Sequence, residues 1–253
     1  MSYYKHKLLT IKKKQSGRDA SGHVSVRHQG GQHKRFLRNI DWKRNKLDIP
    51  AKVAGIEYDP NRTAAVALII YADGQKSYIL APYKLKVGDT IITSPQAEIK
   101  LGNCLYLKNI PVGVPIHCLE ITPGKGAQMV KGAGTAAYVE SIDGDKVAVK
   151  LPSTEVRIFR SDAKATIGQL SNLDLINIKF TKAGDKRRRG IRPTVRGVAQ
   201  HPDSHPHGGG EGRSSIGMHP KTPWGRPALG KKTRKKKKHS NRLIVKQRKR
   251  KND

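Results

Sequence analysis

Cysteine and aromatic side chains are scarce in this chain of 253 residues. Its two cysteines, Cys104 and Cys118, exclude a disulfide-dense secreted scaffold and any zinc site built from four cysteines, and they favour a reducing, intracellular setting. Aromatic residues make up 5% of the chain, which is too few for an extended platform on which successive bases of a single strand stack.

Long hydrophobic runs are also absent. In residues 1–14 the apolar patch Leu8, Leu9 and Ile11 lies between lysines and is too short for a signal-peptide core or a membrane span. This lysine-rich segment lacks the Arg and Ser enrichment of an organelle transit peptide, although that alternative stays open. We therefore expect a protein that is neither secreted nor membrane-spanning.

Acidic residues are few, with 19 Asp and Glu against 51 Lys and Arg, so the net charge is +32. Residues 1–50 hold 13 basic and 3 acidic side chains (net +10), residues 51–178 hold 14 and 12 (net +2), and residues 179–253 hold 24 and 4 (net +20). A nearly neutral middle between two cationic ends predicts a folded core with extensions that bind a polyanion, because like charges repel until a partner neutralises them.

The neutral middle consists of short β-branched runs separated by turn residues, a spacing typical of small all-β barrels or sandwiches. The strongest hairpin signal is Ala72-Asp73-Gly74, because Asp-Gly tolerates the positive φ of a tight turn. We expect two small barrels that pack against each other. The first set of strands is expected at 52–58, 64–71, 76–80, 90–93 and near 105–107, and the second at 115–121, 137–142, 146–151, 155–160 and 165–167.

From Lys179 onward the apolar pattern ends, and Gly, Pro, His, Lys and Arg dominate. Such a segment cannot bury enough apolar surface to offset an ordering entropy of about 1–2 kcal/mol per residue, so we expect it to order only on a partner. The triplet Leu243-Ile244-Val245 is the exception, and we expect it to be a local anchor.

Nucleic acid is the polyanion that these extensions fit best. Binding to a membrane surface needs an amphipathic helix, which the Gly- and Pro-broken C-terminal extension cannot form. The clusters Lys186–Arg189 and Lys235–Lys238 supply charges for phosphates. Gly30-Gly31, Gly132–Gly134 and Gly208–Gly210 let backbone amides approach an irregular surface closely, and folded RNA offers such a surface more often than a regular duplex does.

Three motifs that resemble catalytic sites lack what their chemistry needs. Residues 225–232 approach a nucleotide phosphate loop, but Lys232 replaces the magnesium-binding hydroxyl and no apolar strand precedes the motif. Residues 132–137 resemble a dinucleotide fingerprint, but a β-run follows where a helix is required.

The third motif is a set of four histidines, His201, His205, His207 and His219, in a proline-broken loop. Closed zinc sites generally pair such ligands with cysteines, and an Asp203-Ser204-His205 run cannot converge as a triad because its members are adjacent. We expect these imidazoles to contact RNA, and no metal site, while they keep the ability to move a proton.

The sequence resembles the bacterial and organellar branch of large-subunit ribosomal protein two. The resemblance is carried by Ser204–Arg213 (SHPHGGGEGR), His219-Pro220 and Thr222–Gly225 (TPWG). Further matching stretches are Arg27–Lys34, Glu57–Arg62, Tyr78–Pro82, Asn109–Gly113, Pro123–Gly126 and Arg192–Gly197.

The resemblance implies a mainly β protein with an OB-fold followed by an SH3-like barrel and long basic extensions at both ends. The implied domains are a basic N-terminal extension (1–36), an OB-fold-like RNA-binding barrel (37–109), an SH3-like barrel (110–178) and a basic Gly/Pro/His-rich extension that penetrates ribosomal RNA (179–253).

The implied function is that of a structural constituent of the large ribosomal subunit and not of an enzyme. It would bind ribosomal RNA and support subunit association, tRNA binding and the peptidyl transferase centre. The implied partners are large-subunit RNA, neighbouring ribosomal proteins and the small subunit at the intersubunit face, with no membrane. The implied location is the ribosome of a bacterial cytoplasm or of an organelle, and no cofactor is expected except Mg²⁺ ions shared with the RNA.

The residues expected to contact RNA lie on the barrels and on the extensions. On the barrels they are Arg62, Lys125 and Arg157. On the extensions they are Arg27, His28, Lys34, Arg192, Arg196, His205, His207, Gly208, Gly209, Gly210, Arg213, Trp224 and Lys231.

His205 matches the family's histidine that has been discussed for peptide-bond chemistry, so it is the one candidate for a catalytic side chain. The sequence departs from the family at Ser204, where an aspartate usually precedes this histidine, and at Gln32, where a third glycine is usual. Two alternatives stay open: catalysis through His205, and a nucleic-acid chaperone that acts outside the ribosome.

Overall fold

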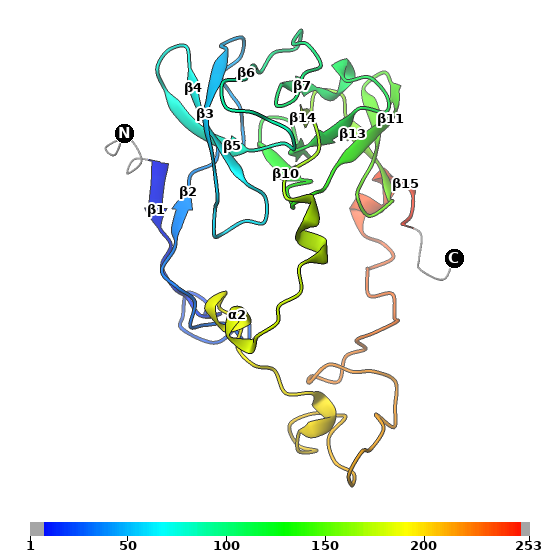
Figure 1. Cartoon of the computed structure of the whole chain (residues 1–253). Helices are drawn as coiled ribbons and strands as arrows, with labels where there is room; N and C mark the ends of the chain where they lie inside the picture. The colour runs from blue at the N-terminus through cyan, green and yellow to red at the C-terminus, as the bar shows by residue number, and fades with distance from the viewer. Residues whose placement is uncertain (1–7, 249–253) are drawn as a thin grey trace. The chain divides into compact units, whose positions relative to one another are not determined.

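The computed structural model describes residues 8–248, which form two compact units (Figure 1). Unit 1 contains the described residues up to Lys12, Lys34–Lys179 and the described residues from His239 onward, and unit 2 contains Lys13–His33 and Phe180–Lys238. The two cationic extensions, expected as separate arms (1–36 and 179–253), thus share one unit over much of their length. The outermost residues of both lie outside the described range.

The first sheet of unit 1 has four antiparallel strands in the order β5-β4-β3-β6. They are β3 (Ala51–Glu57), β4 (Val66–Tyr71), β5 (Lys76–Leu80) and β6 (Thr90–Ile91). The hairpin between β4 and β5 turns at Gly74, whose φ of +79° is the left-handed geometry that the Asp-Gly signal predicts. Alternate residues of β3 and β4, including Val53 and Ile69, are buried in one core cluster.

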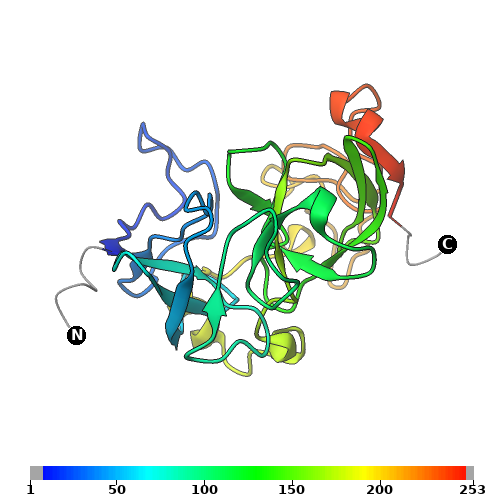
Figure 2. The same ribbon diagram turned by 90° about the horizontal axis from the view of Figure 1, so that it is seen from above.

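The second sheet of unit 1 has seven strands in the order β15-β13-β12-β11-β8-β14-β7, and it lies beside the first sheet (Figure 2). The strands are β7 (Cys104–Tyr106), β8 (Pro115–His117), β11 (Ala137–Asp143), β12 (Lys146–Lys150), β13 (Val156–Arg160), β14 (Lys164–Ile167) and β15 (Ile244–Lys246). Its inner face holds the largest core cluster, which includes Ile116, Val139, Val149 and Phe159. The chain is therefore mainly β, with curled sheets consistent with small barrels, as predicted.

The two barrels pack against each other as expected, through backbone and side-chain contacts. Tyr83 donates its N–H to the carbonyl of Gln169 at 2.7 Å, and Leu170 belongs to the core cluster that contains Val66 and Tyr78. These contacts join residues 169–170, which follow β14, to the loop after β5 and to a core cluster of the first sheet.

Two strand predictions were wrong in detail. The strand near Leu105 was assigned to the first barrel, but β7 pairs with β14, and Leu105 is buried in the core of the second sheet. The single strand expected at 115–121 is divided into β8 and β9 (Leu119–Glu120), because Cys118 has a φ of +50°, which breaks the extended backbone.

Several short elements were not predicted. The strands are β1 (Leu9–Ile11), which pairs with β2 (Phe36–Arg38), and β10 (Ala127–Met129), which pairs with β9. The helices are η1 (Leu107–Asn109), η2 (Leu173–Asn177), α2 (Ala183–Arg188), η3 (Gly197–Ala199) and η4 (His239–Leu243). Elements of three to six residues are too short to show a hydrophobic period.

The triplet at 243–245 is confirmed as a local anchor. It ends η4 and begins β15, which forms the edge of the second sheet and pairs with β13 through Arg157 and Ile244. The chain therefore returns to unit 1 after the residues of unit 2.

Unit 2 has no hydrophobic core: within residues 8–248, every core cluster consists of residues of unit 1. This agrees with the loss of apolar pattern after Lys179. Backbone hydrogen bonds join residues 188–192 of the segment to residues 28–33, and the expectation that the segment orders only on a partner stays a prediction. Within the described range, no helix combines the length and apolar character needed to cross a bilayer.

Candidate nucleic-acid interface

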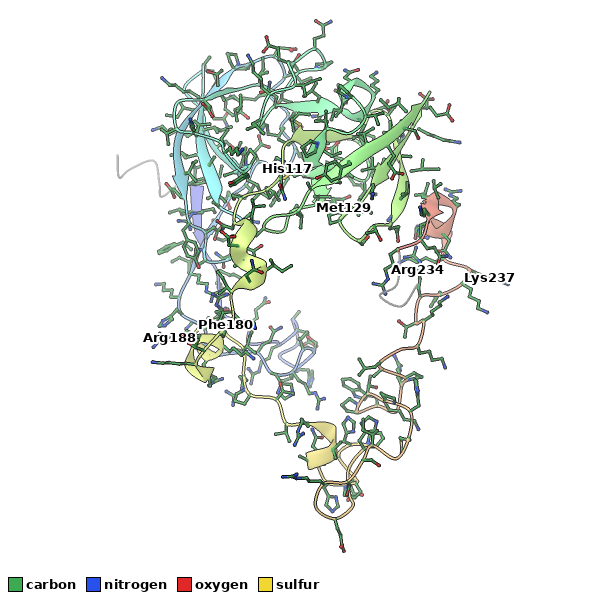
Figure 3. The ribbon with its side chains drawn as sticks, turned by 45° about the vertical axis from the view of Figure 1, so that its right-hand side comes forward. His117, Met129, Phe180, Arg188, Arg234 and Lys237 are labelled. Carbon is green, nitrogen blue, oxygen red and sulfur yellow. The ribbon has the colours of Figure 1, made fainter. Side chains whose placement is uncertain are left out.

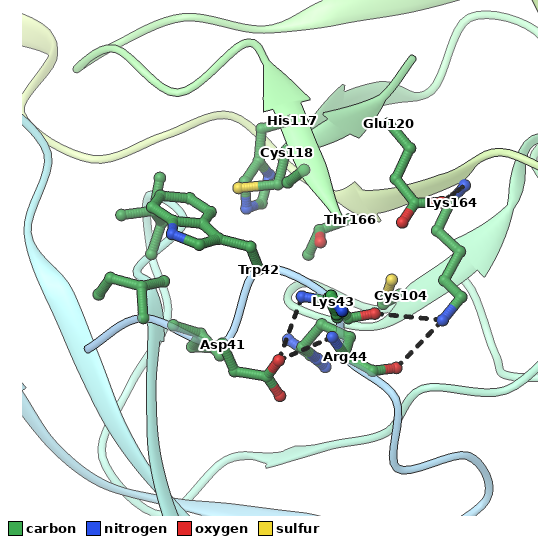
Figure 4. A pocket seen from close by; sticks show the side chains of 14 residues that line it. Asp41, Trp42, Lys43, Arg44, Cys104, His117, Cys118, Glu120, Lys164 and Thr166 are labelled. Carbon is green, nitrogen blue, oxygen red and sulfur yellow. Dashed lines mark hydrogen bonds between the residues drawn. The ribbon is translucent and has the colours of Figure 1, made fainter. Parts of the chain in front are cut away.

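The segment Asp41–Arg44 runs between the two barrels, and Trp42 lines the small cavity there (Figure 4). Arg44 is 6% exposed; its Nε donates to Thr93 Oγ1 at 3.0 Å, and its backbone N–H donates to Asp41 Oδ1 at 2.8 Å. Lys164 on β14 donates from Nζ to the backbone carbonyls of Lys43 (3.1 Å) and Arg44 (3.3 Å). Asp41 also donates its backbone N–H to Tyr78 O on β5 at 2.8 Å, so the segment is bound to both sheets.

Buried polar groups near this segment are held by backbone partners. Glu120 is 2% exposed and accepts hydrogen bonds from the backbone N–H groups of Gly126 (2.9 Å) and Lys164 (3.0 Å). His117 Nδ1 lies 2.8 Å from the Gly168 carbonyl, and burial lowers the pKa of this imidazole to about 4, so it is neutral at physiological pH. The cavity among these groups measures about 20 Å³, which admits a water molecule but no cofactor.

Arg62 is bound within the protein and is less available than the sequence analysis assumed. Its Nε donates to Asp59 Oδ2 at 3.0 Å, and this carboxylate is fully buried. The Arg62 guanidinium also lies 5.1 Å from the centroid of Trp42, and Lys131 Nζ lies 4.5 Å from the same ring. Arg62 thus stabilises the barrel, and an RNA contact would be an additional role.

The other two barrel-side candidates differ in exposure. Lys125 is exposed in the turn before β10, where its backbone N–H donates to Thr122 O at 3.2 Å. Arg157 is half-buried on β13, with its guanidinium carbon 5.9 Å from the centroid of Phe159. Lys125 therefore has the freer side chain for a phosphate.

Unit 2 is organised by pairing between its two chain segments. Gly30 donates its backbone N–H to Gly190 O at 2.9 Å, and Arg192 donates its own to His28 O at 3.0 Å. His28 adds a side-chain bond, because its Nδ1 lies 3.0 Å from the carbonyl of Pro193. The pairing places His28 beside Arg192, and the RNA contacts expected of both residues stay a prediction.

His205 is 7% exposed, so it is enclosed and not presented to solvent. Its Nδ1 accepts the backbone N–H of His207 at 3.0 Å, and the two imidazole centroids are 4.7 Å apart. A Cβ placed on Gly197 would lie 2.5 Å from the His205 ring, so the ring packs directly on the Gly197 backbone. His207 in turn accepts the backbone N–H of Lys221 at Nε2, at 2.9 Å. Both imidazoles therefore organise the loop.

The Gly208–Gly210 run follows this histidine pair and curves tightly. A Cβ on Gly208 would lie 2.5 Å from the Gln200 carbonyl oxygen, and Gly210 has a φ of +83°. Side chains are thus excluded at Gly208 by space and at Gly210 by backbone conformation. The run forms a compact loop, and its expected close approach to RNA stays a prediction.

The remaining cationic candidates are exposed. In unit 2, Arg196 lies before η3, Arg213 follows the glycine run, and Lys231 precedes the stretch that carries Arg234 and Lys237 (Figure 3). Lys34 is exposed at the start of a segment of unit 1, so the structure does not group it with these residues.

The charge of unit 2 is strongly unbalanced. Its residues include 21 Lys and Arg and 4 Asp and Glu, a net charge of +17. Four carboxylates cannot neutralise 21 cations within the unit, so its folded form favours a polyanionic partner. Within residues 8–248, no group of three or more His, Cys, Asp or Glu side chains is arranged to hold a metal ion.

Sequence reasoning missed two residues that matter here. Trp42 carries the cations of Arg62 and Lys131 over its ring, and Arg187 reaches the 28–33 segment, where its terminal nitrogen would lie 3.7 Å from a Cβ on Gly31. Their partners are distant in sequence, so no local motif signals either contact. The basic run at 186–189 predicted a positive charge but not the contact that Arg187 makes with the 28–33 segment.

Two family models match the chain. Residues 5–93 match the RNA-binding N-terminal domain of ribosomal proteins L2, and residues 100–225 match the C-terminal domain of the same proteins. The matches span both barrels and the histidine- and glycine-containing loop, and they agree with the cationic character of unit 2. The chain therefore belongs to the ribosomal protein L2 family, structural RNA-binding proteins of the large ribosomal subunit that are not classical enzymes.

Proposed function

We propose that this protein holds folded large-subunit RNA through unit 2 and through exposed cations of the barrels, and that it thereby supports subunit association, tRNA binding and the peptidyl transferase centre. The observation that carries the proposal is the net charge of +17 on a unit without a hydrophobic core. Such a unit gains stability when phosphates occupy its surface. Small-subunit contact at the intersubunit face and a bacterial or organellar ribosome belong to the same proposal.

The proposed contacts are the residues predicted from the sequence, divided into those with exposed side chains and those packed within the protein. Arg196, Arg213, Lys231, Lys34 and Lys125 have exposed side chains suited to phosphates. The Gly208–Gly210 run supplies close backbone approach. Arg62, Arg157 and His205 are packed within the protein, so we assign them mainly to positioning.

The test is reconstitution of large subunits that lack this protein, with the wild type or with a triple variant Arg192→Ala, Arg196→Ala, Arg213→Ala. A matched control, Lys86→Ala, Lys146→Ala, Lys150→Ala, removes three exposed charges of the barrels that are not among the proposed RNA contacts. We expect the first variant to incorporate at least tenfold less at moderate salt and the control to incorporate normally, because each lost phosphate contact weakens affinity and shallows the salt dependence by about one unit. Equal incorporation of both variants would overturn the proposal.

The finer roles require separate readouts on the assembled particles. Light scattering measures association with small subunits, filter binding measures tRNA affinity, and a single-turnover peptidyl transfer assay measures the chemical step. The variant for these readouts is the triple substitution Gly208→Ala, Gly209→Ala, Gly210→Ala. If its particles assemble completely and behave normally in all three readouts, the proposed roles beyond RNA binding are wrong.

The catalytic alternative for His205 makes a different prediction. A general base should give a loss of about 10²-fold or more in the chemical step of His205→Ala particles whose assembly is intact. The enclosed ring and its bond to the His207 backbone favour a positioning role, for which we expect a defect in assembly.

A further inference from the structure

Trp224 stands at the tip of a tight, internally bonded turn in unit 2. Thr222 donates its backbone N–H to Arg226 O at 2.7 Å, and its Oγ1 accepts the backbone N–H of Arg226 at 3.2 Å. Gly225 completes the turn with a φ of +73° and an N–H bond to Thr222 O at 2.9 Å. The base of the turn is closed by a bridge between Lys221 and Pro227. The backbone of Trp224 is therefore fixed.

The side chain at this tip is almost fully presented to solvent. Trp224 is 73% exposed, although a large apolar ring is normally covered. The Arg27 guanidinium carbon lies over the ring, 5.3 Å from its centroid. A guanidinium can cover only one face, and the large exposed fraction requires the opposite face to be open.

The other tryptophan of the chain shows what a structural role looks like. Trp42 is half-buried, and two cations, Arg62 and Lys131, lie against its ring. Trp224 has the same kind of cationic contact from Arg27 but lacks the burial. Packing within the protein therefore does not account for the position of its ring.

The surroundings indicate what would cover the open face. A planar ring that carries a phosphate satisfies both the indole, by stacking, and the excess of cations in unit 2, among which Arg226 is exposed and two positions away. An aromatic side chain of a neighbouring protein would satisfy only the indole. Nucleobases of folded RNA are accessible for stacking where they are unpaired.

We propose that Trp224 binds one unpaired nucleobase of RNA by stacking on the indole face opposite Arg27. Arg27 pre-orients the ring, and Arg226 is available for the phosphate of the stacked nucleotide. The proposal deepens the RNA-binding function proposed above and rests on it. It concerns a single base, so it is consistent with the low aromatic content of the chain.

The first test uses the full chain and a short single-stranded RNA, compared with an abasic oligonucleotide of equal length and charge. We expect Trp224→Leu to weaken binding of the base-containing RNA about tenfold and to leave the abasic affinity unchanged, whereas Trp224→Phe retains most of the affinity. Leu229→Ala is the matched control, because Leu229 is 72% exposed in the same unit and should not matter. Equal losses for both oligonucleotides, or no loss for either, would sink the proposal.

The second test places the site in the assembled particle. In reconstituted large subunits, chemical probing of the ribosomal RNA should show one unpaired nucleotide that becomes reactive with Trp224→Leu and stays protected with Leu229→Ala. If no nucleotide changes while the particle forms normally, the stacking proposal fails and the RNA-binding function stands. If the wild type fails to bind either oligonucleotide and fails to enter particles, the proposed function itself is wrong.

Discussion

The Nδ1 atom of His28 lies 3.0 Å from the carbonyl oxygen of Pro193, 165 residues further along the chain. Because a carbonyl only accepts, the imidazole donates, and the bond ties the N-terminal segment of unit 2 to its C-terminal segment. His28 also has a φ of +61°, a left-handed conformation that is uncommon for residues other than glycine. Unit 2 therefore depends on this contact between two segments that are far apart in the sequence.

Replacement of His28 should loosen the pairing. We expect His28→Ala to speed amide hydrogen exchange of Gly30 and Arg192 by about fivefold, because one hydrogen bond contributes a net of about 1 kcal/mol. His23→Ala, at an exposed position of the same segment, serves as the control. Unchanged exchange in His28→Ala would show that the backbone pairing alone holds the segments.

A methyl group at Gly197 should displace His205. Gly197→Ala places a Cβ 2.5 Å from the His205 ring, so we expect the ring to leave its enclosed position and the bond to the His207 backbone to be lost. NMR of the histidine side chains measures this change. Gly184→Ala in α2, where a Cβ meets nothing within 4 Å, should leave the His205 signals unmoved; equal shifts in both variants would contradict the packing described.

Stability should fall in mild acid because of His117. Burial lowers the pKa of His117 from 6.5 to about 4, so the unfolded chain takes up a proton near pH 6.5 that the folded chain accepts only near pH 4. The stabilisation is complete above pH 6.5 and is lost as the pH falls toward 4, by up to about 3 kcal/mol.

The pH effect is measured as the difference in unfolding free energy between the wild type and His117→Gln, which cannot titrate but can donate to the Gly168 carbonyl. Carboxylates common to both proteins cancel in this difference. A difference that stays constant from pH 7 to about 4 would refute the assignment to His117.

Substitution of Arg62 should lower stability, whereas substitution of Lys125 should change only RNA binding. Arg62→Ala leaves the fully buried Asp59 carboxylate without its closest cation, so we expect a loss of about 3 kcal/mol in unfolding free energy. Lys125→Ala should leave stability unchanged and reduce the salt slope of RNA binding by about one unit. Denaturant titrations and binding at several salt concentrations measure the two effects; a stable Arg62→Ala protein with a reduced slope would return Arg62 to the RNA-contact set.

Local sequence was sufficient to predict the strands from 51 to 80 and from 137 to 160, because alternating burial and a turn residue such as Gly74 are determined by neighbours. The uneven charge likewise predicted an RNA-binding protein, since phosphate attraction depends on composition more than on geometry. The SHPHGGGEGR loop supplied the family.

Tertiary structure alone decided which distant segments meet. β7 joins the second sheet because Leu105 fits that core, and Arg62 is drawn to the buried Asp59 and the ring of Trp42. The two extensions form one unit because His28 and Gly30 find hydrogen-bond partners beyond Arg189, and Trp224 receives Arg27 from the other segment. Such partners are chosen by the packing of the whole chain, and residues far apart in sequence carry no local pattern that announces them.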